Sequence, residues 1–489
     1  MREYLTLSLL LLTIRSIVCV EKCKPNIAVI GGGIGGASAS HFLGELFNKD
    51  LHIDLYEAKT IGGRLATVKI DENEYEAGGS IIHHRNKYMQ QFANLLGLEH
   101  RPSSDQTAGI WNGREFVFEE SSWKWITFAK LIYKYGIQPL KMNRHINVML
   151  DQFDNIYDLQ NKGMSFENVT ALLTAMNNEF PKLLEVTLKA ELLKLGYKEE
   201  FIDELVNSAI VTNYGQETNV HSFVGSISLA GIGEDLWAVK GGNKKVPEHL
   251  IYSNINVNVV PAYVKKIRNV PEDNTHSYKV YYSNKDSEDI MESTYDVVII
   301  ASRLTHDQEY PIEFEGFPEN NYYSQGKYHT TVATFIKGDL HSQYFGLDKE
   351  MDAILSCNPN NSVFNSIGRQ ISVEGPTEKG SRVWKIFSKE PLKPEKIHEL
   401  FSKVEEIKEI PWKAYPQYSA ENRFDKFKLY ENLYHLNAIE WAASAMEMSA
   451  IAGRNVALLV YNDFAKKCPH INSVDVNKGK PAKQGMNEL

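Results

Sequence analysis

The sequence predicts an α/β fold in which a Rossmann-type nucleotide-binding domain is discontinuous along the chain and an α+β domain is inserted into it. The first observation behind this prediction is a complete strand, glycine-rich turn, helix and second strand within residues 26–59. The second is a pair of intervals, residues 102–236 and 304–424, that separate later strand-like segments and are far longer than ordinary loops. One nucleotide-binding domain, interrupted twice, accounts for both observations.

The composition is that of an ordinary globular protein. Of the 489 residues, 43% are hydrophobic and 24% are charged, which is enough to build a large core. The net charge of −9 argues against a nucleic-acid-binding surface. The four cysteines, at positions 19, 23, 357 and 468, have neither C-x-x-C nor metal-ligand spacing. Neither a thiol relay nor a metal site is therefore expected.

The two ends of the chain differ from the rest. Residues 1–20 combine Arg2 with an apolar run and then smaller residues, which is typical of a secretory signal peptide; a loosely hydrophobic tail is the alternative. Two N-x-[ST] sequons, at Asn168 and Asn360, would then be available for N-glycosylation. No other run approaches the length of a transmembrane helix, and residues 468–489 read as a polar tail.

The turn after the first strand has the pattern of a dinucleotide-binding loop. Gly31 would permit a tight turn, Gly33 would let a pyrophosphate approach the backbone, and Gly36 would let helix and strand pack closely. The second strand ends at Glu57, about 20 positions on, where an acidic side chain would bind ribose hydroxyls. Because no Arg neighbours Glu57, a 2′-phosphate and hence NADP are not expected. A plain glycine turn between core elements is the alternative.

Two more glycine segments follow the second strand and indicate which nucleotide is bound. With them the sequence resembles the flavin-dependent oxidases of the amine-oxidase superfamily. The resemblance implies FAD as the cofactor, with an Arg near its pyrophosphate and the later glycine segment beside its isoalloxazine ring. The residues that carry these roles are Gly62, Gly63, Arg64, Gly78, Gly79 and Ser80.

Further matches lie far along the chain, as a discontinuous flavin domain requires. The resemblance places Val264 against the adenine, and the apolar run "YDVVIIAS", which includes Ala301, is suited to a buried parallel strand. The predicted FAD-binding domain comprises residues 25–101, 237–303 and 425–467, and the predicted substrate domain comprises residues 102–236, largely helical, and 304–424.

A narrower resemblance covers nearly the whole predicted mature chain. Blocks from "YEAGGSIIH" to "LYHLNAIEWAASAMEMSAIAGRNVA" (residues 433–457) are similar to the prenylcysteine oxidases, FAD-dependent thioether oxidases of lysosomes. In that family the last block brings a helix N-terminus to the flavin, which makes Asn437 and Glu440 candidate cofactor contacts. The sequence departs from the family at Lys244, where relatives tend to be more apolar.

The resemblance implies a reaction: oxidation of farnesyl- or geranylgeranylcysteine to a prenyl aldehyde and free cysteine. Hydride loss from a carbon bonded to sulfur needs no strong general base, which fits a sequence without a nucleophile triad. Only one dinucleotide fingerprint is present, so O2 is the expected acceptor and hydrogen peroxide the product. His83 and His84 follow the second glycine segment and are candidates for orienting water or tuning the flavin; ordinary surface or packing histidines are the alternative.

Two other functions stay open at this point: a different FAD-dependent oxidase, such as one acting on amines, and a flavin-binding carrier without turnover. For the favoured function the resemblance implies the secretory pathway, with the lysosome preferred over secretion. It also allows a peripheral membrane contact through the lipid substrate.

Overall fold

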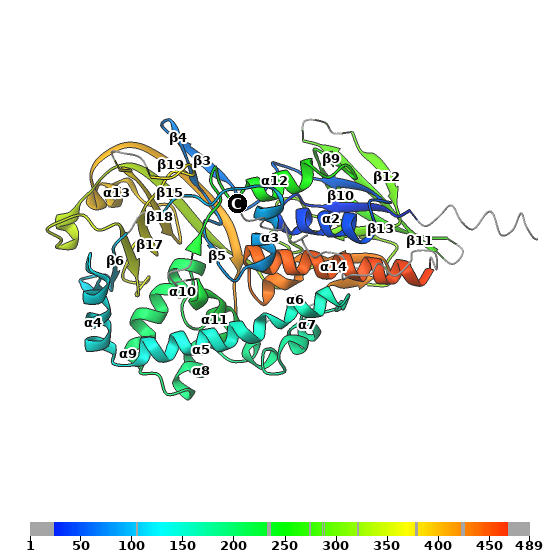
Figure 1. Ribbon diagram of the computed structural model, residues 1–489. Coiled ribbons are helices and arrows are strands. Elements are labelled where there is room, and N and C mark those ends of the chain that lie inside the picture. The colour runs from blue at the N-terminus through cyan, green and yellow to red at the C-terminus, as the bar shows by residue number, and fades with distance from the viewer. Residues whose placement is uncertain are drawn as a thin grey trace, which may run out of the picture.

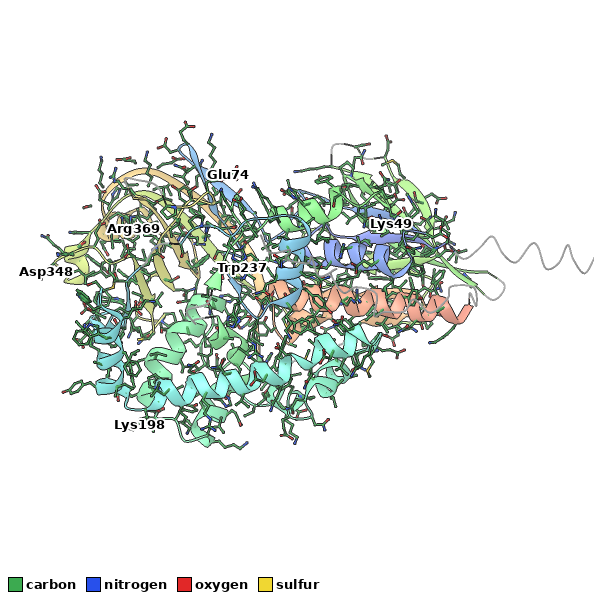
Figure 2. The ribbon with its side chains drawn as sticks, viewed as in Figure 1. Lys49, Glu74, Lys198, Trp237, Asp348 and Arg369 are labelled. Carbon is green, nitrogen blue, oxygen red and sulfur yellow. The ribbon has the colours of Figure 1, made fainter. Side chains whose placement is uncertain are left out.

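A computed structural model describes residues 24–467 except 104–105, 232–235, 273–274, 286, 288, 320–321, 377–379 and 422–425. The predicted signal peptide (1–20) and polar tail (468–489) lie outside the described residues. Figure 1 shows two sheet regions side by side, with a layer of helices from the first insertion running beneath them. Figure 2 places Trp237 between these regions and Lys198 and Asp348 at the edge of the molecule.

The nucleotide-binding region is built on a six-stranded sheet of order β20-β21-β13-β1-β2-β9. All neighbouring pairs are parallel except β20 with β21. The strands come from three separate stretches of sequence, so the predicted α/β fold with a discontinuous Rossmann-type domain is confirmed. Their bounds are β1 (Asn26–Ile30), β2 (His52–Tyr56), β9 (Val257–Val260), β13 (Val297–Ile300), β20 (Lys428–Tyr430) and β21 (Leu433–His435).

Strand β1 is apolar and buried from Ile27 to Ile30, with both of its faces covered. Ile27 and Val29 point to the side of the helices, whereas Ala28 and Ile30 belong to a second cluster on the opposite face. The helices on the first side are α2 (Ile34–Leu46), α3 (Lys87–Leu95), α12 (Lys245–Tyr252) and α14 (Met446–Lys467). The opposite face is covered by a four-stranded sheet of β10 (Ala262–Glu272), β11 (Thr275–Asn284), β12 (Met291–Tyr295) and β14 (Glu313–Glu315).

The second region is a seven-stranded sheet of order β19-β15-β18-β17-β16-β6-β7. Residues 102–236, predicted to be largely helical, contribute its last two strands before becoming helical. The hairpin of β3 (Thr67–Ile70) and β4 (Asn73–Glu76) packs its apolar side chains against this sheet, although its sequence lies inside the first nucleotide-binding segment. The strand bounds are β6 (Ala108–Trp111), β7 (Phe116–Glu119), β15 (Tyr328–Leu340), β16 (Ala353–Ser356), β17 (Ser366–Arg369), β18 (Val383–Ser388) and β19 (Phe401–Pro416).

The helices of the first insertion form the lower layer in Figure 1, where α5 and α6 run under both sheet regions. They are α4 (Lys124–Tyr135), α5 (Gln138–Phe153), α6 (Asn155–Asn161), α7 (Val169–Met176), α8 (Leu188–Lys194), α9 (Glu199–Phe201), α10 (Asn207–Tyr214) and α11 (Ser222–Ala230), with short helical turns η1 (Pro181–Leu184) and η2 (Ile202–Val206). The remaining elements are β5 (Ile82–His83), β8 (Leu236–Trp237), η3 (Ser342–Phe345), α13 (Pro394–Leu400) and η4 (Leu436–Trp441). Within the described residues, we find no helix with the length and apolar character needed to cross a bilayer.

Candidate functional site

The glycine turn after β1 leaves no room for a side chain at Gly31 or Gly36. A Cβ on Gly31, whose φ is +117°, would lie 2.7 Å from the main-chain oxygen of Ala301. A Cβ on Gly36, in the first turn of α2, would lie 2.0 Å from the main-chain oxygen of Gly31. The two glycines therefore let α2 approach the ends of β1 and β13, which is the close packing that the sequence pattern requires.

Gly33 is different, because the space beside it is open. A Cβ there would have only the main-chain oxygen of Gly62 within 4 Å, at 3.9 Å. Gly33 is also the N-cap of α2, whose first turn has no acidic side chain. The first amides of a helix have no intrahelical acceptor, and they carry the positive end of the helix dipole. The turn thus leaves a backbone surface suited to an anion such as a pyrophosphate.

The second glycine segment is joined to the first. The Gly62 N–H donates to the main-chain oxygen of Gly32 at 2.9 Å, and Gly62 and Gly63 both have positive φ values, +113° and +58°. The Glu57 carboxylate lies at the same place, since its Oε2 accepts the Gly32 N–H at 2.8 Å. The structure thus brings Glu57 and both glycine segments to the carboxyl ends of the parallel strands, where nucleotides bind in sheets of this type.

The third segment, Gly78 to Ser80, is held in place by its backbone. A Cβ on Gly78 would lie 1.9 Å from the main-chain oxygen of Arg64, which also accepts the Gly79 N–H at 3.1 Å. The buried Asn243 side chain donates to the Gly79 oxygen at 3.0 Å. We call residues 31–36, 62–64 and 78–80 together the cofactor cradle.

The C-terminal block reaches the cradle as expected. Met446, the first residue of α14, lies against the cradle, with its Cε 3.8 Å from the position of a Cβ on Gly79. The N-terminus of α14 therefore faces the third glycine segment, and η4 comes just before it in the chain. Helix N-termini favour electron-rich and anionic groups, such as the edge of a reduced flavin.

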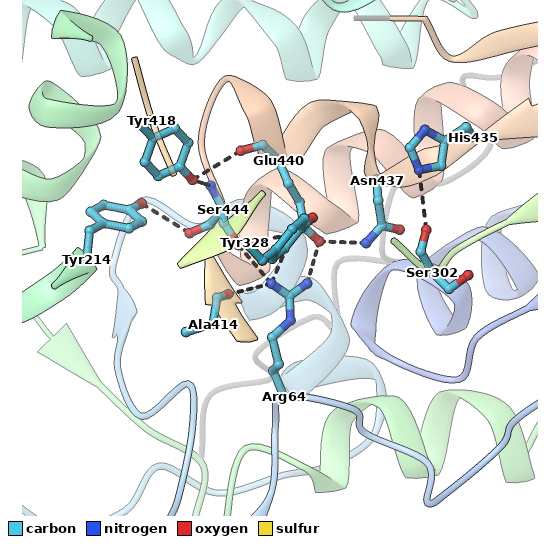
Figure 3. Close-up of polar contacts among 10 residues, drawn as sticks. All are labelled: Arg64, Tyr214, Ser302, Tyr328, Ala414, Tyr418, His435, Asn437, Glu440 and Ser444. Atoms are coloured by element: carbon cyan, nitrogen blue, oxygen red, sulfur yellow. Dashed lines mark hydrogen bonds and ion pairs between the residues drawn. The ribbon is translucent and has the colours of Figure 1, made fainter. Parts of the chain in front are cut away.

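A buried ion pair connects η4 to the cradle (Figure 3). The Arg64 guanidinium binds both carboxylate oxygens of Glu440, with 2.9 Å from Nη1 to Oε2. Tyr328 donates its hydroxyl hydrogen to the same carboxylate at 2.8 Å, and Asn437 donates its amide at 2.6 Å. Glu440 is 1% exposed at its side chain. Burial alone would raise its pKa, but Arg64 and the Tyr328 hydroxyl lower the pKa below its ordinary value. Glu440 is therefore a carboxylate with a fixed orientation.

Two polar atoms beside this pair lack a partner within the described part of the chain. They are Nη1 of Arg303, which follows β13, and Oδ1 of Asn437. Buried polar groups in native proteins are nearly always hydrogen-bonded, so atoms of this kind indicate a ligand or an ordered solvent molecule. The cradle and this pair of atoms together offer a bound dinucleotide backbone amides, a guanidinium donor and an amide acceptor.

Comparisons with known proteins place this geometry in a family. The model of the prenylcysteine lyase family matches residues 118–473, and a model described as an NAD(P)-binding Rossmann-like domain matches residues 29–96. Prenylcysteine oxidase 1 of Mus musculus is 39% identical over 472 residues, with 93% of both chains covered. The chain belongs to the prenylcysteine lyase family. Within the same family, prenylcysteine oxidase 1-like of Homo sapiens is 33% identical over 466 residues, with 92% of this chain and 93% of the relative covered.

Solved structures of two other proteins share the fold. A putrescine oxidase superposes with a TM-score of 0.58 at 14% identity, covering 89% of this chain and 99% of that chain. A fatty acid isomerase from P. acnes superposes with a TM-score of 0.60 at 14% identity, covering 89% and 98%. At such identity these similarities show the fold alone. Family membership and the fold together identify FAD as the cofactor, and the cradle fits it.

The structure brings most of the predicted site residues together at the cradle, but not all of them. Val264 is buried on β10, in the apolar cluster under β1 with Tyr56. His83 lies on β5 and is half-buried, whereas His84 is exposed, and their rings are 4.3 Å apart. Contact of Val264 with the adenine, and of the two histidines with the flavin ring, stays a prediction.

Sequence reasoning did not single out Lys385 on β18. This side chain is 6% exposed, and its Nζ donates to the main-chain oxygen of Glu76 at 3.1 Å, two residues before Gly78. Burial lowers the pKa of Lys385 to about 8, against an opposing effect of the Glu76 carboxylate. A lysine inside the apolar run "VWKIFS" was the available signal. Lys385 is therefore a titratable group close to the cradle.

The departure at Lys244 has a structural reason. Its Nζ donates to Thr67 Oγ1 at 2.7 Å and pairs with the Glu74 carboxylate at 2.9 Å, so it ties α12 to the β3–β4 hairpin. The charged residue therefore has its own partners on the hairpin.

Glu447, in the first turn of α14, predicts that the free energy of unfolding depends on pH. It is 3% exposed and accepts the N–H groups of Tyr88 (2.8 Å) and Met89 (3.0 Å) at the start of α3, and the Tyr157 hydroxyl (2.7 Å). Burial raises its pKa to about 7, so the folded state retains a proton that the unfolded chain releases near pH 4. The protonated Glu447 therefore contributes about 3 kcal/mol to the free energy of unfolding below pH 4, and this contribution is lost as the pH rises toward 7.

The Glu447→Gln variant should therefore show a flatter decline of unfolding free energy between pH 4 and 7 than the wild type, as measured by urea denaturation across that range. The matched control is Glu72→Gln, at a side chain that is 90% exposed. An unchanged pH dependence in Glu447→Gln would contradict the assignment.

His221 predicts the opposite dependence of folding stability on pH. Its Nδ1 accepts the Val224 N–H at 3.2 Å as the N-cap of α11, which leaves Nε2–H to donate to the Trp441 oxygen at 3.0 Å. Burial lowers the pKa of His221 to about 4, whereas an unfolded histidine titrates near 6.5. This neutral histidine contributes stability above pH 6.5 that is lost, by about 3 kcal/mol, as the pH falls toward 4.

In His221→Asn the cap acceptor is kept but does not titrate, so acid should destabilise this variant less than the wild type. The half-exposed His52→Asn is the control. Equal acid sensitivity of wild type and His221→Asn, measured by thermal unfolding between pH 4 and 7, is the result that would refute the assignment.

Proposed function

We propose that the protein oxidises the thioether of farnesylcysteine or geranylgeranylcysteine. The prenyl carbon bonded to sulfur loses a hydride, water adds to the resulting cation, and the hemithioacetal collapses to a prenyl aldehyde and free cysteine. O2 takes up the two electrons and two protons and becomes hydrogen peroxide. FAD, when bound, supplies the hydride acceptor and passes the electrons to O2.

The observation that carries the proposal is the 39% identity to prenylcysteine oxidase 1 across 93% of both chains. The match is not confined to the nucleotide-binding region, because the family model spans residues 118–473 and so includes most of the first insertion and all of the second. Substrate specificity in such folds resides in the inserted elements, so similarity there supports the same substrate class.

The polar groups of the site support a reaction without a strong general base. Glu440 is already paired with Arg64, and burial lowers the pKa of His435, near Ser302, to about 4. These groups hold fixed charges or stay neutral, which suits orientation and electrostatics more than proton abstraction. The proton released when water adds to the cation needs only a weak acceptor, which solvent water provides.

Product analysis tests the proposal against both alternatives. The FAD-loaded protein is incubated in air with farnesylcysteine, S-methylcysteine or putrescine, and peroxide, thiol and aldehyde are quantified. Farnesylcysteine should yield the three products in equal amounts, and S-methylcysteine, which has no allylic carbon to stabilise the cation, should yield none. Turnover of putrescine instead would indicate an amine oxidase, and no turnover of any substrate would indicate a carrier.

For the cellular setting we propose the secretory pathway, with the lysosome as the destination. The apolar residues 1–20 and the two sequons support this proposal. Asn360 is exposed, whereas Asn168 is half-buried as the N-cap of α7, so Asn360 is the better glycan acceptor. We also propose a peripheral contact with membranes, from which a prenylated substrate would be drawn.

A further inference from the structure

Helix α4 has large aromatic side chains on its solvent-exposed face. Among its 12 residues only Tyr135 is buried. Trp125 and Phe128, one turn apart, are 68% and 51% exposed, and Tyr133 is 93% exposed. The α4–α5 patch, as we call it, comprises Trp123, Trp125, Phe128, Tyr133, Ile137 and Leu140, each at least 49% exposed.

Two of the three lysines of α4 are hydrogen-bonded back to the protein. Lys130 Nζ donates to the main-chain oxygen of Glu119 at 3.0 Å, and Lys134 Nζ donates to that of Val117 at 2.7 Å. Lys134 also pairs with the Glu204 carboxylate at 2.6 Å. A surface helix in water presents its charged side chains outward and its apolar ones to the core. On α4, large aromatic side chains face outward as well, which marks this face as a surface for something other than water.

The segment that forms the patch is also purely basic. Residues 121–150 contain no Asp or Glu, in a chain whose net charge is −9. The basic side chains of the segment are Lys124, Lys130, Lys134, Lys141 and Arg144. Aromatic side chains flanked by lysine and arginine, without acids, are the composition of helices that lie at a bilayer surface.

We propose that the α4–α5 patch docks the protein on an anionic membrane. Tryptophan and tyrosine favour the boundary between headgroups and acyl chains, and the net positive charge of the acid-free segment, which includes the exposed Arg144, is attracted to lipid phosphates. A negatively charged bilayer complements both features at once, whereas a protein partner would normally offer discrete carboxylates and shaped pockets. In Figure 1, α4 stands at the end of the molecule remote from the Rossmann-type sheet, which leaves its outer face accessible to a flat surface.

Vesicle flotation tests the proposal. The FAD-loaded wild type should float with phosphatidylcholine vesicles that contain phosphatidylserine, less with phosphatidylcholine alone, and less as salt is raised. Trp125→Glu/Phe128→Glu should weaken the partition by about tenfold or more, because two aromatic anchors are lost. The matched control is Tyr252→Glu/Ile255→Glu, since these residues are 68% and 84% exposed outside the patch. This control should float like the wild type.

Three results would overturn the proposal: a wild type that stays with the soluble fraction, an equal loss in the control pair, or a wild-type dimer that Trp125→Glu/Phe128→Glu converts to a monomer, which would assign the patch to a second copy of the chain. Circular dichroism and FAD absorbance of each variant show whether it is folded. The vesicles contain no prenylcysteine and no turnover is measured, so the result is independent of the proposed reaction.

Discussion

Replacing Arg64 with methionine should lower the free energy of unfolding by about 3 kcal/mol. The reason is the burial of Glu440: its side chain is 1% exposed, and without Arg64 the hydrogen-bond donors left to the carboxylate are the neutral side chains of Tyr328, Asn437 and Ser444. Breaking a buried pair from one side costs about 3–5 kcal/mol, and the lower end is expected because Arg64 itself is 35% exposed. Urea denaturation of the apoprotein measures the change.

The matched control for Arg64→Met is Lys59→Met. Lys59 pairs with Glu309 at 2.6 Å, but both side chains are more than half exposed, and such pairs contribute little. The double variant Arg64→Met/Glu440→Gln should recover part of the unfolding free energy lost in Arg64→Met, because it removes the unpaired charge of the buried Glu440 carboxylate. If Arg64→Met were no more destabilising than Lys59→Met, the Arg64–Glu440 pair would not be the buried link described.

The second large effect is expected for Gly36→Ala. The new Cβ would be 2.0 Å from the main-chain oxygen of Gly31, so either α2 or the glycine turn must move. Such a clash with backbone costs up to about 3 kcal/mol and displaces the amides of the cradle. The purified variant should therefore melt at a lower temperature and carry little FAD, which the ratio of flavin to protein absorbance measures.

Gly44→Ala is the control for Gly36→Ala, because it changes the same residue type in the same helix. A Cβ on Gly44 would meet nothing closer than Asn254 Nδ2 at 3.4 Å, and alanine is the better helix former. This variant should retain FAD and match or exceed the stability of the wild type. Full flavin content in Gly36→Ala would show that the close approach of α2 to β1 is not required.

Sequence reasoning found the parts of the site that depend on local backbone geometry. Gly31 and Gly36 are needed because the chain itself leaves no space there, and such a requirement appears as a fixed local pattern. The alternating environment of β1 likewise follows from a continuous apolar run. These features involve residues close in sequence, so periodicity and spacing were sufficient to predict them.

Features that depend on tertiary contacts were harder to predict from the sequence. Arg64 and Glu440 were each predicted as cofactor contacts, but nothing in the sequence indicated that they pair across 376 positions. Arg303 and Tyr328 were missed because neither belongs to a recognisable motif. The β3–β4 hairpin was assigned by its position in the chain, whereas its packing is set by apolar contacts with the second sheet, which no local pattern specifies.

The most direct test of the central claim is an anaerobic absorbance titration of the purified protein with farnesylcysteine, followed by admission of air. We expect the long-wavelength flavin band to bleach in proportion to added substrate, and to return with release of hydrogen peroxide when air enters. A yellow protein whose band does not bleach with farnesylcysteine would contradict the proposed reaction, and a colourless protein that takes up no FAD would contradict the cofactor site itself.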